Sequence, residues 1–295
     1  MKSLRTTIAL FLILALVVSC NSGNEKKGET NSAASSLSEV MKAADAISPE
    51  ITNVEDVFKT LELVEARYYP ILCNDPYSAT LYLESKTVAA ANLGVYITDI
   101  VYHMYGEATS DMFITFSASQ ELAKYIGLEA EFAATILTEL EGGGDISRDS
   151  LIYVFNGLME NSEKYSSENE MAYVHTSFLA GLYVEKLFIT SSLLDQAYNK
   201  EEKSEDDITN TKKLLVVFQN QLESVDALAA SLDGQFSHVE NLVAENELDE
   251  LKANVAGLDS KIKEILDTEE LQACEYVTNI HELLTSMRNR IVSAS

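Results

Sequence analysis

Apolar residues recur with the period of an α-helix along almost the whole chain after residue 52. In the first such segment, Asn53 stands where a helix cap is expected and Pro70 stands where the helix should end. The apolar stripe between them consists of Val54, Val57, Phe58, Leu61, Val64 and Tyr68. The same period predicts further helices at about residues 79–105, 110–126, 129–141, 148–165, 168–199, 209–232, 247–266 and 270–292. Alternating stretches flanked by hairpin turns are lacking, so we predict an all-α fold, a multi-helix bundle of about nine helices.

The last third of the chain has the most regular spacing. Three segments place apolar residues alternately three and four positions apart, from Leu215 to Leu232, from Leu248 to Ile265 and from Ala273 to Ile291. Narrow apolar seams of this kind pack against one another in bundles and coiled coils. We therefore predict a helical bundle at residues 51–205 and an antiparallel three-helix unit at residues 206–295. This unit either closes on itself or packs on the bundle.

A short internal similarity links the two longest predicted helices. The segment LGVYI at residues 93–97 resembles AGLYV at residues 180–184. A glycine inside a helix costs about 1 kcal/mol relative to alanine. We expect Gly94 and Gly181 each to let another helix pass close by, with the tyrosine two residues on packing beside the crossing. A duplicated helical unit is one interpretation of the similarity, and a chance match is the other.

The first twenty residues differ in character from the rest. Lys2 and Arg5 precede an apolar run from Ile8 to Val18 that ends on Ser19. This layout is typical of a cleaved export signal, and the run is too short to span a bilayer. Residues 17–20, Val-Val-Ser-Cys, resemble the lipobox of bacterial lipoproteins, although the lipobox more often begins with leucine. The resemblance implies removal of residues 1–19 and acylation of Cys20; the alternative is a secreted protein with an incidental cysteine.

Residues 20–50 predict a lipidated cysteine followed by a flexible polar tether. The segment is rich in Ser, Asn, Gly, Lys and Glu and has no sustained apolar period. A tether of this length reaches on average about 30 Å. We therefore expect the lipid bilayer to be a partner through acylated Cys20, with the protein in the cell envelope and its domain outside the cytoplasm.

The formal charge of the chain is −26. Because phosphate backbones are bound by clusters of Lys and Arg, nucleic acid is excluded as an expected partner. Anionic headgroups are equally unfavourable, so membrane contact should come from the lipid and not from a basic surface. The acidity also has a simple interpretation, since net charge keeps a protein soluble.

One group of residues has spacing that suits a ligand or metal site. Asp99, His103 and Glu107 lie four positions apart, on one face of a predicted helix or its end. Imidazole and carboxylate groups bind Zn²⁺ and other divalent ions. A hydrogen-bonded histidine and carboxylate pair is the alternative interpretation.

Two further cysteines, Cys73 and Cys274, would meet oxidising conditions in an exported protein. They either pair in a disulfide or remain two unpaired, half-buried thiols. The sequence alone does not place their Cα atoms within bridging distance.

Known catalytic motifs are lacking in the sequence. It contains no Glu-x-x-His, His-Glu-x-x-His, Gly-x-Ser-x-Gly, Cys-x-x-Cys or phosphate-binding glycine-rich loop. We therefore name no catalytic residue and no cofactor. Seven tyrosines in the first third would either line a ligand cleft or lie at the edge of the core; they are Tyr68, Tyr69, Tyr77, Tyr82, Tyr96, Tyr102 and Tyr105.

The lipobox, the polar tether and the two Gly-x-Tyr helices together resemble a group of uncharacterised all-helical lipoproteins of Bacteroidetes-type bacteria. The resemblance covers the first two-thirds of the chain and implies no residue roles. We expect a membrane-anchored cell-envelope lipoprotein whose helical domain binds another protein or a small ligand in a groove between helices. The alternative is an envelope hydrolase or metal-dependent enzyme with a dispersed active site.

Overall fold

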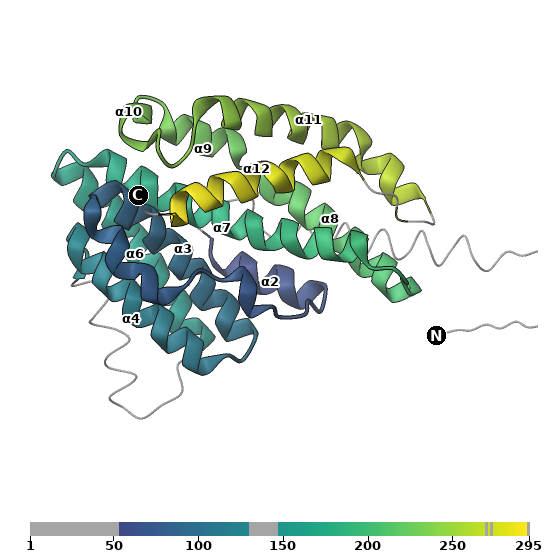
Figure 1. Ribbon diagram of the computed structural model, residues 1–295, viewed down its shortest axis with the longest axis horizontal. Coiled ribbons are helices and arrows are strands. Elements are labelled where there is room, and N and C mark those ends of the chain that lie inside the picture. The colour runs from purple at the N-terminus through teal and green to yellow at the C-terminus, as the bar shows by residue number, and fades with distance from the viewer. Residues whose placement is uncertain (1–52, 130–146, 269–270, 272–273, 294–295) are drawn as a thin grey trace, which may run out of the picture.

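The computed structural model describes residues 53–129, 147–268, 271 and 274–293. Within them the chain forms ten α-helices, two 3-10 helices and no β-strand, which confirms the predicted all-α fold (Figure 1). In chain order the elements are α2 (Glu55–Leu63), η1 (Pro70–Leu72), η2 (Pro76–Glu84), α3 (Lys86–Tyr105), α4 (Thr109–Ile126), α6 (Arg148–Glu168), α7 (Ala172–Asn199), α8 (Glu205–Leu222), α9 (Val225–Leu232), α10 (Phe236–Val239), α11 (Glu245–Asp267) and α12 (Glu275–Val292). The predicted signal, Cys20, the tether and nearly all of the predicted helix at 129–141 lie outside the described residues.

Three predicted helices are wrong at their ends. The helix expected from Asn53 to Pro70 ends at Leu63, because Glu65 takes a left-handed conformation with a φ of 49°. The helix expected at 79–105 begins only at Lys86, because Ser85 caps it by accepting a hydrogen bond from the backbone N–H of Val88 at 3.1 Å. The segment before it forms η2, which starts at Pro76. The helix expected at 209–232 is divided into α8 and α9 at Glu223 and Ser224, where hydrogen bonds to residues three positions earlier tighten the last turn of α8.

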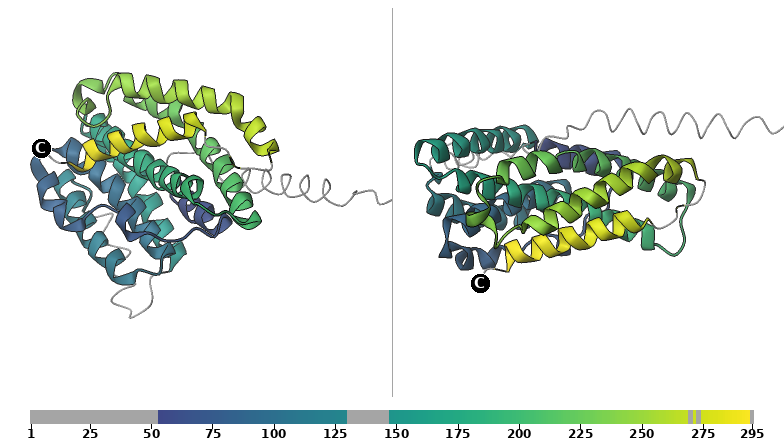
Figure 2. Two further views of the ribbon diagram at one scale, coloured as in Figure 1. Left: turned by 45° about the vertical axis from the view of Figure 1, so that its right-hand side comes forward. Right: turned by 90° about the horizontal axis from the view of Figure 1, so that it is seen from above.

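Helix α7 is the centre of the bundle. It packs against α3 on one side and α12 on the other, and it also contacts α6, α8 and α9 (Figures 1 and 2). By length and composition α7 could cross a membrane, but 94% of its apolar window is buried inside the fold. A helix that is apolar on all sides is what the centre of a bundle requires.

The closest helix crossing joins α3 and α7 at two glycines. A Cβ atom on Gly181 would lie 1.9 Å from the carbonyl oxygen of Ala91, and one on Gly94 would lie 2.3 Å from the carbonyl oxygen of Phe178. Tyr96 and Tyr183 are fully buried beside the crossing. The expected role of the two glycines is thereby confirmed, and the helix pair they permit positions the polar side chains described below.

The seam of α11 packs on the other two C-terminal seams, against α8, α9 and α12. Helices α8, α9 and α12 in turn pack on α7 of the bundle. Helices α11 and α12 lie side by side, but α12 packs more extensively on α7 than on α11 (Figure 2). A single cluster of buried apolar residues extends from Val54 to Ile291. The hydrophobic core therefore continues without a break across the predicted boundary between residues 205 and 206.

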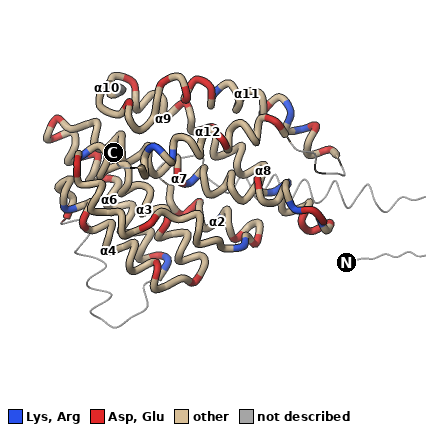
Figure 3. The backbone as a smooth tube through the Cα atoms, in the orientation of Figure 1, with Lys and Arg blue, Asp and Glu red and all other residues tan. Residues whose placement is uncertain are grey.

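Acidic side chains are spread over nearly every element, with a dense group in the connection from α7 to α8 (Figure 3). In that connection Ser204 and Asp207 form a capping box that starts α8. The Nζ of Lys200 donates a hydrogen bond to the Asp207 carboxylate at 2.7 Å. This part of the acidic surface thus has a structural role.

Candidate functional site

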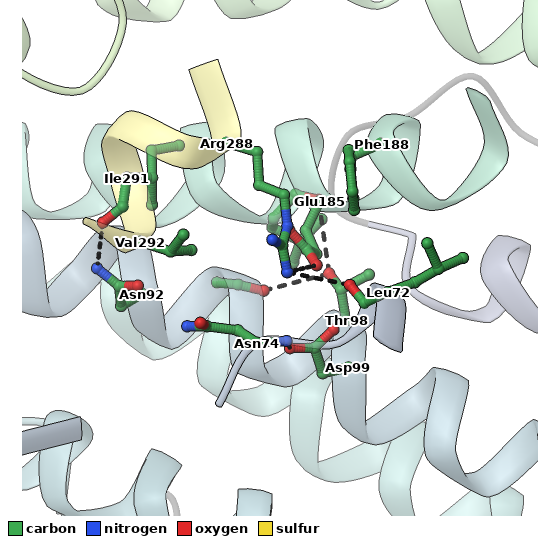
Figure 4. Close-up of polar contacts among 12 residues, drawn as sticks. Leu72, Asn74, Asn92, Thr98, Asp99, Glu185, Phe188, Arg288, Ile291 and Val292 are labelled. Atoms are coloured by element: carbon green, nitrogen blue, oxygen red, sulfur yellow. Dashed lines mark hydrogen bonds and ion pairs between the residues drawn. The ribbon is translucent and has the colours of Figure 1, made fainter. Parts of the chain in front are cut away.

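A charged pair in the core joins the C-terminal helix to α7. The Nε and Nη2 atoms of Arg288 donate hydrogen bonds to the two carboxylate oxygens of Glu185 at 2.8 and 3.1 Å (Figure 4). The Nη2 atom also donates to the carbonyl oxygen of Leu72 at 3.0 Å, and the guanidinium lies 4.4 Å from the ring centre of Phe188. Glu185 is fully buried and Arg288 is 9% exposed. Removing either partner would leave a buried charge without its counter-charge.

Asp99 of α3 lies beside this pair and is also fully buried. Its Oδ2 accepts a hydrogen bond from the backbone N–H of Asn74 at 2.9 Å, and its carboxyl group is within hydrogen-bonding range of Glu185. Burial, and next the charge of Glu185, raise the pKa of Asp99 well above its usual value, while Arg288 and the Asn74 N–H act in the opposite direction. We call Asp99, Glu185 and Arg288 the polar centre.

Hydrogen bonds next to the polar centre hold the end of α12. Tyr82 donates its hydroxyl to the carbonyl oxygen of Val292 at 3.0 Å, and Asn92 donates its Nδ2 to the carbonyl oxygen of Ile291 at 2.8 Å (Figure 4). The last carbonyl groups of a helix have no partner within the helix, so these side chains from η2 and α3 supply one. The polar centre and these two bonds together attach α12 to the rest of the fold.

His103 is part of a separate hydrogen-bonded group. Its Nδ1 lies 2.8 Å from the Tyr68 hydroxyl and its Nε2 lies 3.2 Å from the Thr115 hydroxyl, so both ring nitrogens have partners. Burial lowers the pKa of His103, while Asp111 acts to raise it. The side chain is therefore a satisfied core histidine. Its partners are hydroxyl groups and not the carboxylate of Asp99, so the pair that the sequence suggested is not what the described residues form.

The face predicted for Asp99, His103 and Glu107 does not form as expected. Helix α3 ends at Tyr105, and Glu107 follows in an exposed turn with a φ of 55°. Among the described residues no group of three or more His, Cys, Asp and Glu side chains could hold a metal ion. The three residues are thus not a common ligand set, because the helix that should have aligned them ends too early.

The two described cysteines are both free. Cys73 follows Leu72, whose carbonyl binds Arg288, whereas Cys274 stands at the opposite end of α12 from Arg288, about 20 Å away at the usual helical rise. A disulfide needs Cα atoms within about 7 Å. The disulfide considered from the sequence is therefore wrong. Burial, and next the charge of Asp99, raise the pKa of the Cys73 thiol, which disfavours the reactive thiolate.

Most of the early tyrosines support the core. Tyr96 donates its hydroxyl to the carbonyl oxygen of Asp75 at 2.8 Å, Tyr105 donates to that of Ala66 at 2.6 Å, and Tyr102 accepts from the N–H of Tyr69 at 2.9 Å. These bonds attach the irregular segment before α3 to that helix. Tyr77 differs from the others, since it is 78% exposed on η2.

Sequence reasoning missed Glu185 and Arg288, and also Lys186, which is buried on the other side of α7. A signal for them does exist. Two consecutive charged residues stand in the middle of a long apolar helix, where charged side chains are almost never buried without a partner. Which residue pairs with each of them depends on the fold, since Arg288 is 103 residues away from Glu185.

An open groove of about 480 Å³ lies at the surface between the starts of α2 and α7 and the middle of α6. Its lining consists of Asn53, Glu55, Asn156, Met159, Glu160, Glu163 and His175. The Nδ1 of His175 lies 2.8 Å from the Ser162 hydroxyl, and burial lowers the pKa of the ring while Glu163 acts to raise it. The groove thus presents three carboxylates and no cationic Lys or Arg side chain in its lining, an arrangement that attracts positive charge.

We found no match to the chain among protein families, curated proteins or solved structures. What can be said of function therefore depends on the sequence features and on the sites described above.

Proposed function

We propose that the protein is a cell-envelope lipoprotein, anchored through acylated Cys20, whose helical domain binds a small cationic ligand in the acidic groove. The main observation in support of a binding role is the groove itself. Its volume of about 480 Å³ falls within the range of about 300–1,000 Å³ typical of small-molecule sites. The anchoring role is supported by the layout of residues 1–20 and by the polar segment after them.

The charges around the groove favour an organic cation with an amino group. Glu55 is partly compensated, because its carboxylate lies 3.4 Å from Lys59 and 3.7 Å from Arg148. Glu160 and Glu163 lie on neighbouring turns of α6 and are exposed to solvent. They supply two carboxylates to one side of the groove, and an extended amine can pair with both at once. The neutral form of His175 is favoured by burial and adds a polar group without adding repulsion.

Calorimetric titration of the full-length protein with spermidine at physiological ionic strength tests this proposal. The double variant Glu160→Gln/Glu163→Gln should weaken spermidine binding by about tenfold or more, because paired charges at a binding site contribute on this scale. The matched control is Glu201→Gln/Glu202→Gln, which removes the same charge from the exposed connection between α7 and α8 and should leave the affinity nearly unchanged. Equal losses in both variants, or no binding by the wild type, would contradict the groove as the site.

The rival function, an envelope hydrolase or metal-dependent enzyme, has less support. The polar centre has the carboxyl groups that hydrolytic chemistry uses, but Asp99 and Glu185 are fully buried and leave no room for a substrate. A catalytic group must come within about 3 Å of the reacting atom. Metal analysis of the purified protein discriminates further, since a stoichiometric ion would favour the enzyme.

A further inference from the structure

The polar centre contains two carboxyl groups but only one cationic group. Asp99 and Glu185 both lie fully buried against a single guanidinium, that of Arg288. Lys186 follows Glu185 in the chain, but successive residues of a helix point in different directions, and the charge that acts on Lys186 is that of Asp56. With both carboxyl groups ionised, the polar centre would keep one uncompensated negative charge in the core, which is strongly unfavourable.

One oxygen of Asp99 shows how this charge is removed. Among the described residues, Asp99 Oδ1 is buried and has no hydrogen-bond partner, whereas Oδ2 accepts from Asn74. An ionised carboxylate can only accept hydrogen bonds, so two ionised carboxylates cannot bond to each other. A proton makes the Asp99 carboxyl group a donor, and the neighbouring Glu185 carboxylate, whose interaction with Asp99 favours the protonated form, is the acceptor. The same proton thus satisfies the unpaired oxygen and removes the excess charge.

We propose that Asp99 and Glu185 form a buried proton-binding site, in which Asp99 carries one proton and donates it to Glu185 while Glu185 remains the counter-ion of Arg288. The proton belongs on Asp99 because both oxygens of Glu185 already accept from Arg288. The other titratable groups that face Asp99 are Cys73, Tyr68 and Tyr96. A thiol or phenol cannot supply a positive charge, and because burial raises the pKa of each they stay neutral, with the Cys73 thiol a further hydrogen-bonding neighbour of Asp99. Arg288 is therefore the sole cation of this site among the described residues.

Loss of the proton would loosen the attachment of α12. With two adjacent negative charges, Asp99 and Glu185 repel each other, and the contacts that depend on their positions weaken. These contacts are the bonds from Arg288 to Glu185 and Leu72 (Figure 4). Proton binding in the core thereby controls how firmly η1 and the C-terminal helix are held together.

Denaturant unfolding of the full-length protein at a series of pH values tests the proposal. The folded state holds the proton to a higher pH than the unfolded chain, in which Asp ionises at about 3.9. The unfolding free energy of the wild type should therefore fall as pH rises above this value, with a slope that corresponds to up to one extra proton in the folded state. Asp99→Asn keeps a donor and an acceptor in the same positions. It should match the wild-type midpoint at about pH 4, lose this slope and therefore exceed the wild-type midpoint at neutral pH, because its amide takes up no proton on folding.

Two further variants separate proton sharing from simple packing. Glu185→Gln should also fold, with Asp99 ionised as the new counter-ion of Arg288, and it should lack the same slope. Asp99→Asn/Glu185→Gln leaves Arg288 without a counter-charge and should lower the midpoint by more than the two single changes combined. The infrared spectrum of the wild type at neutral pH should contain a carboxylic-acid band that both single variants lack. A wild type without this band, or an Asp99→Asn protein with the wild-type slope, would overturn the proposal.

Discussion

Glu185 and Lys186 are neighbours in the chain, yet each is buried in a different polar cluster. Glu185 faces α3 and α12, while Lys186 is 1% exposed on the side of α7 that faces α2. On that side Thr60 donates its hydroxyl to the backbone carbonyl of Asp56, and Gln221 of α8 donates to the Thr60 hydroxyl. Because α7 is covered on all sides, its charged residues have no route to solvent and depend on partners from other helices.

Lys186 should give the protein an unusual alkaline stability profile. Burial lowers its pKa to about 8, although Asp56 opposes the shift. Between about pH 8 and the unfolded value of about 10.4, the unfolded chain holds the lysine proton and the folded state does not. The unfolding free energy should therefore rise with pH in this window, by at most about 3 kcal/mol.

The measurement is denaturant unfolding from pH 8 to 10, with Lys186→Met compared with the wild type. The variant has no proton to release and should lack the rise. Lys164→Met removes a charge from the exposed surface of α6 and serves as the control, with the wild-type profile expected. A Lys186→Met protein that still gains stability with pH would show that another group is responsible.

At the scale of single residues, the sequence pointed to Asp99 and His103 but not to the residues that they contact. Asp99 and His103 stand out because they lie one turn apart in an apolar helix, and both are buried. Their partners lie on the segments before and after η1 and on α4, α7 and α12, and no local spacing connects these segments. Periodicity reports which residues share a face of one helix, whereas a polar centre is assembled by tertiary packing.

The helices themselves were largely predictable, because each buries a stripe of apolar residues at helical spacing. Their ends depend on single residues. Gly127 ends α4 in the left-handed conformation, with a φ of 96°. The helix predicted at 79–105 wrongly included most of the 3-10 helix η2, because Ser85 was not recognised as the cap of α3. At the division between α8 and α9 the helix is interrupted, but the apolar residues keep their spacing. A pattern of apolar positions therefore does not detect such a division.

The crossing of α3 and α7 predicts opposite effects for two glycine substitutions. In Gly181→Ala the new methyl group would meet the backbone of Ala91 at 1.9 Å, so the two helices would have to separate. We expect a loss of about 3 kcal/mol, the upper part of the usual range for overpacking. A Cβ on Gly157 of α6 would meet nothing within 4 Å, so Gly157→Ala should add about 0.4–1 kcal/mol. Thermal unfolding measures both, and equal effects would contradict the close crossing.

The apolar seam of α11 leads to a prediction about core packing. Leu258 is fully buried, and truncation of a buried leucine to alanine usually costs about 2–5 kcal/mol. Helix α11 continues through Gly257, where the ring of Tyr276 from α12 occupies the space beside the glycine, so Leu258 stays in the seam. Leu258→Ala should therefore lower the thermal midpoint clearly. Lys261→Ala should leave it almost unchanged, because Lys261 is exposed and pairs only with Glu264 of its own helix. Similar small shifts in both variants would show that the seam does not pack.

At the scale of the whole molecule, one cluster of buried apolar residues extends from Val54 to Ile291, so the C-terminal helices share a core with the bundle. The three C-terminal seams are the most regular in the chain, and regular spacing is typical of a self-contained coiled coil. The seam of α11 packs on α8, α9 and α12, but α12 also lies along α7, and Arg288 of α12 bonds Glu185 of α7 in the core. The regular apolar spacing of the C-terminal segments thus predicted the helices but not all of the helices that they contact. The reason is that the apolar surface of α7 is covered by elements from both parts of the chain.

Membrane attachment is the last property that belongs to the molecule as a whole. In the described part of the chain, α7 is the one helix long and apolar enough to cross a bilayer, and its place in the core removes it as a competing anchor. Under the proposed function the attachment then depends on the lipid at Cys20, since two or more acyl chains hold a protein stably to a bilayer. Cys20→Ser should move the protein from the membrane fraction to the supernatant in folded form, as judged by an unchanged thermal midpoint. Cys73→Ser is the matched control and should stay with the membrane, because the Cys73 thiol lies within the fold. A Cys20→Ser protein that remains with the membrane after a high-salt wash would show that the anchor lies elsewhere.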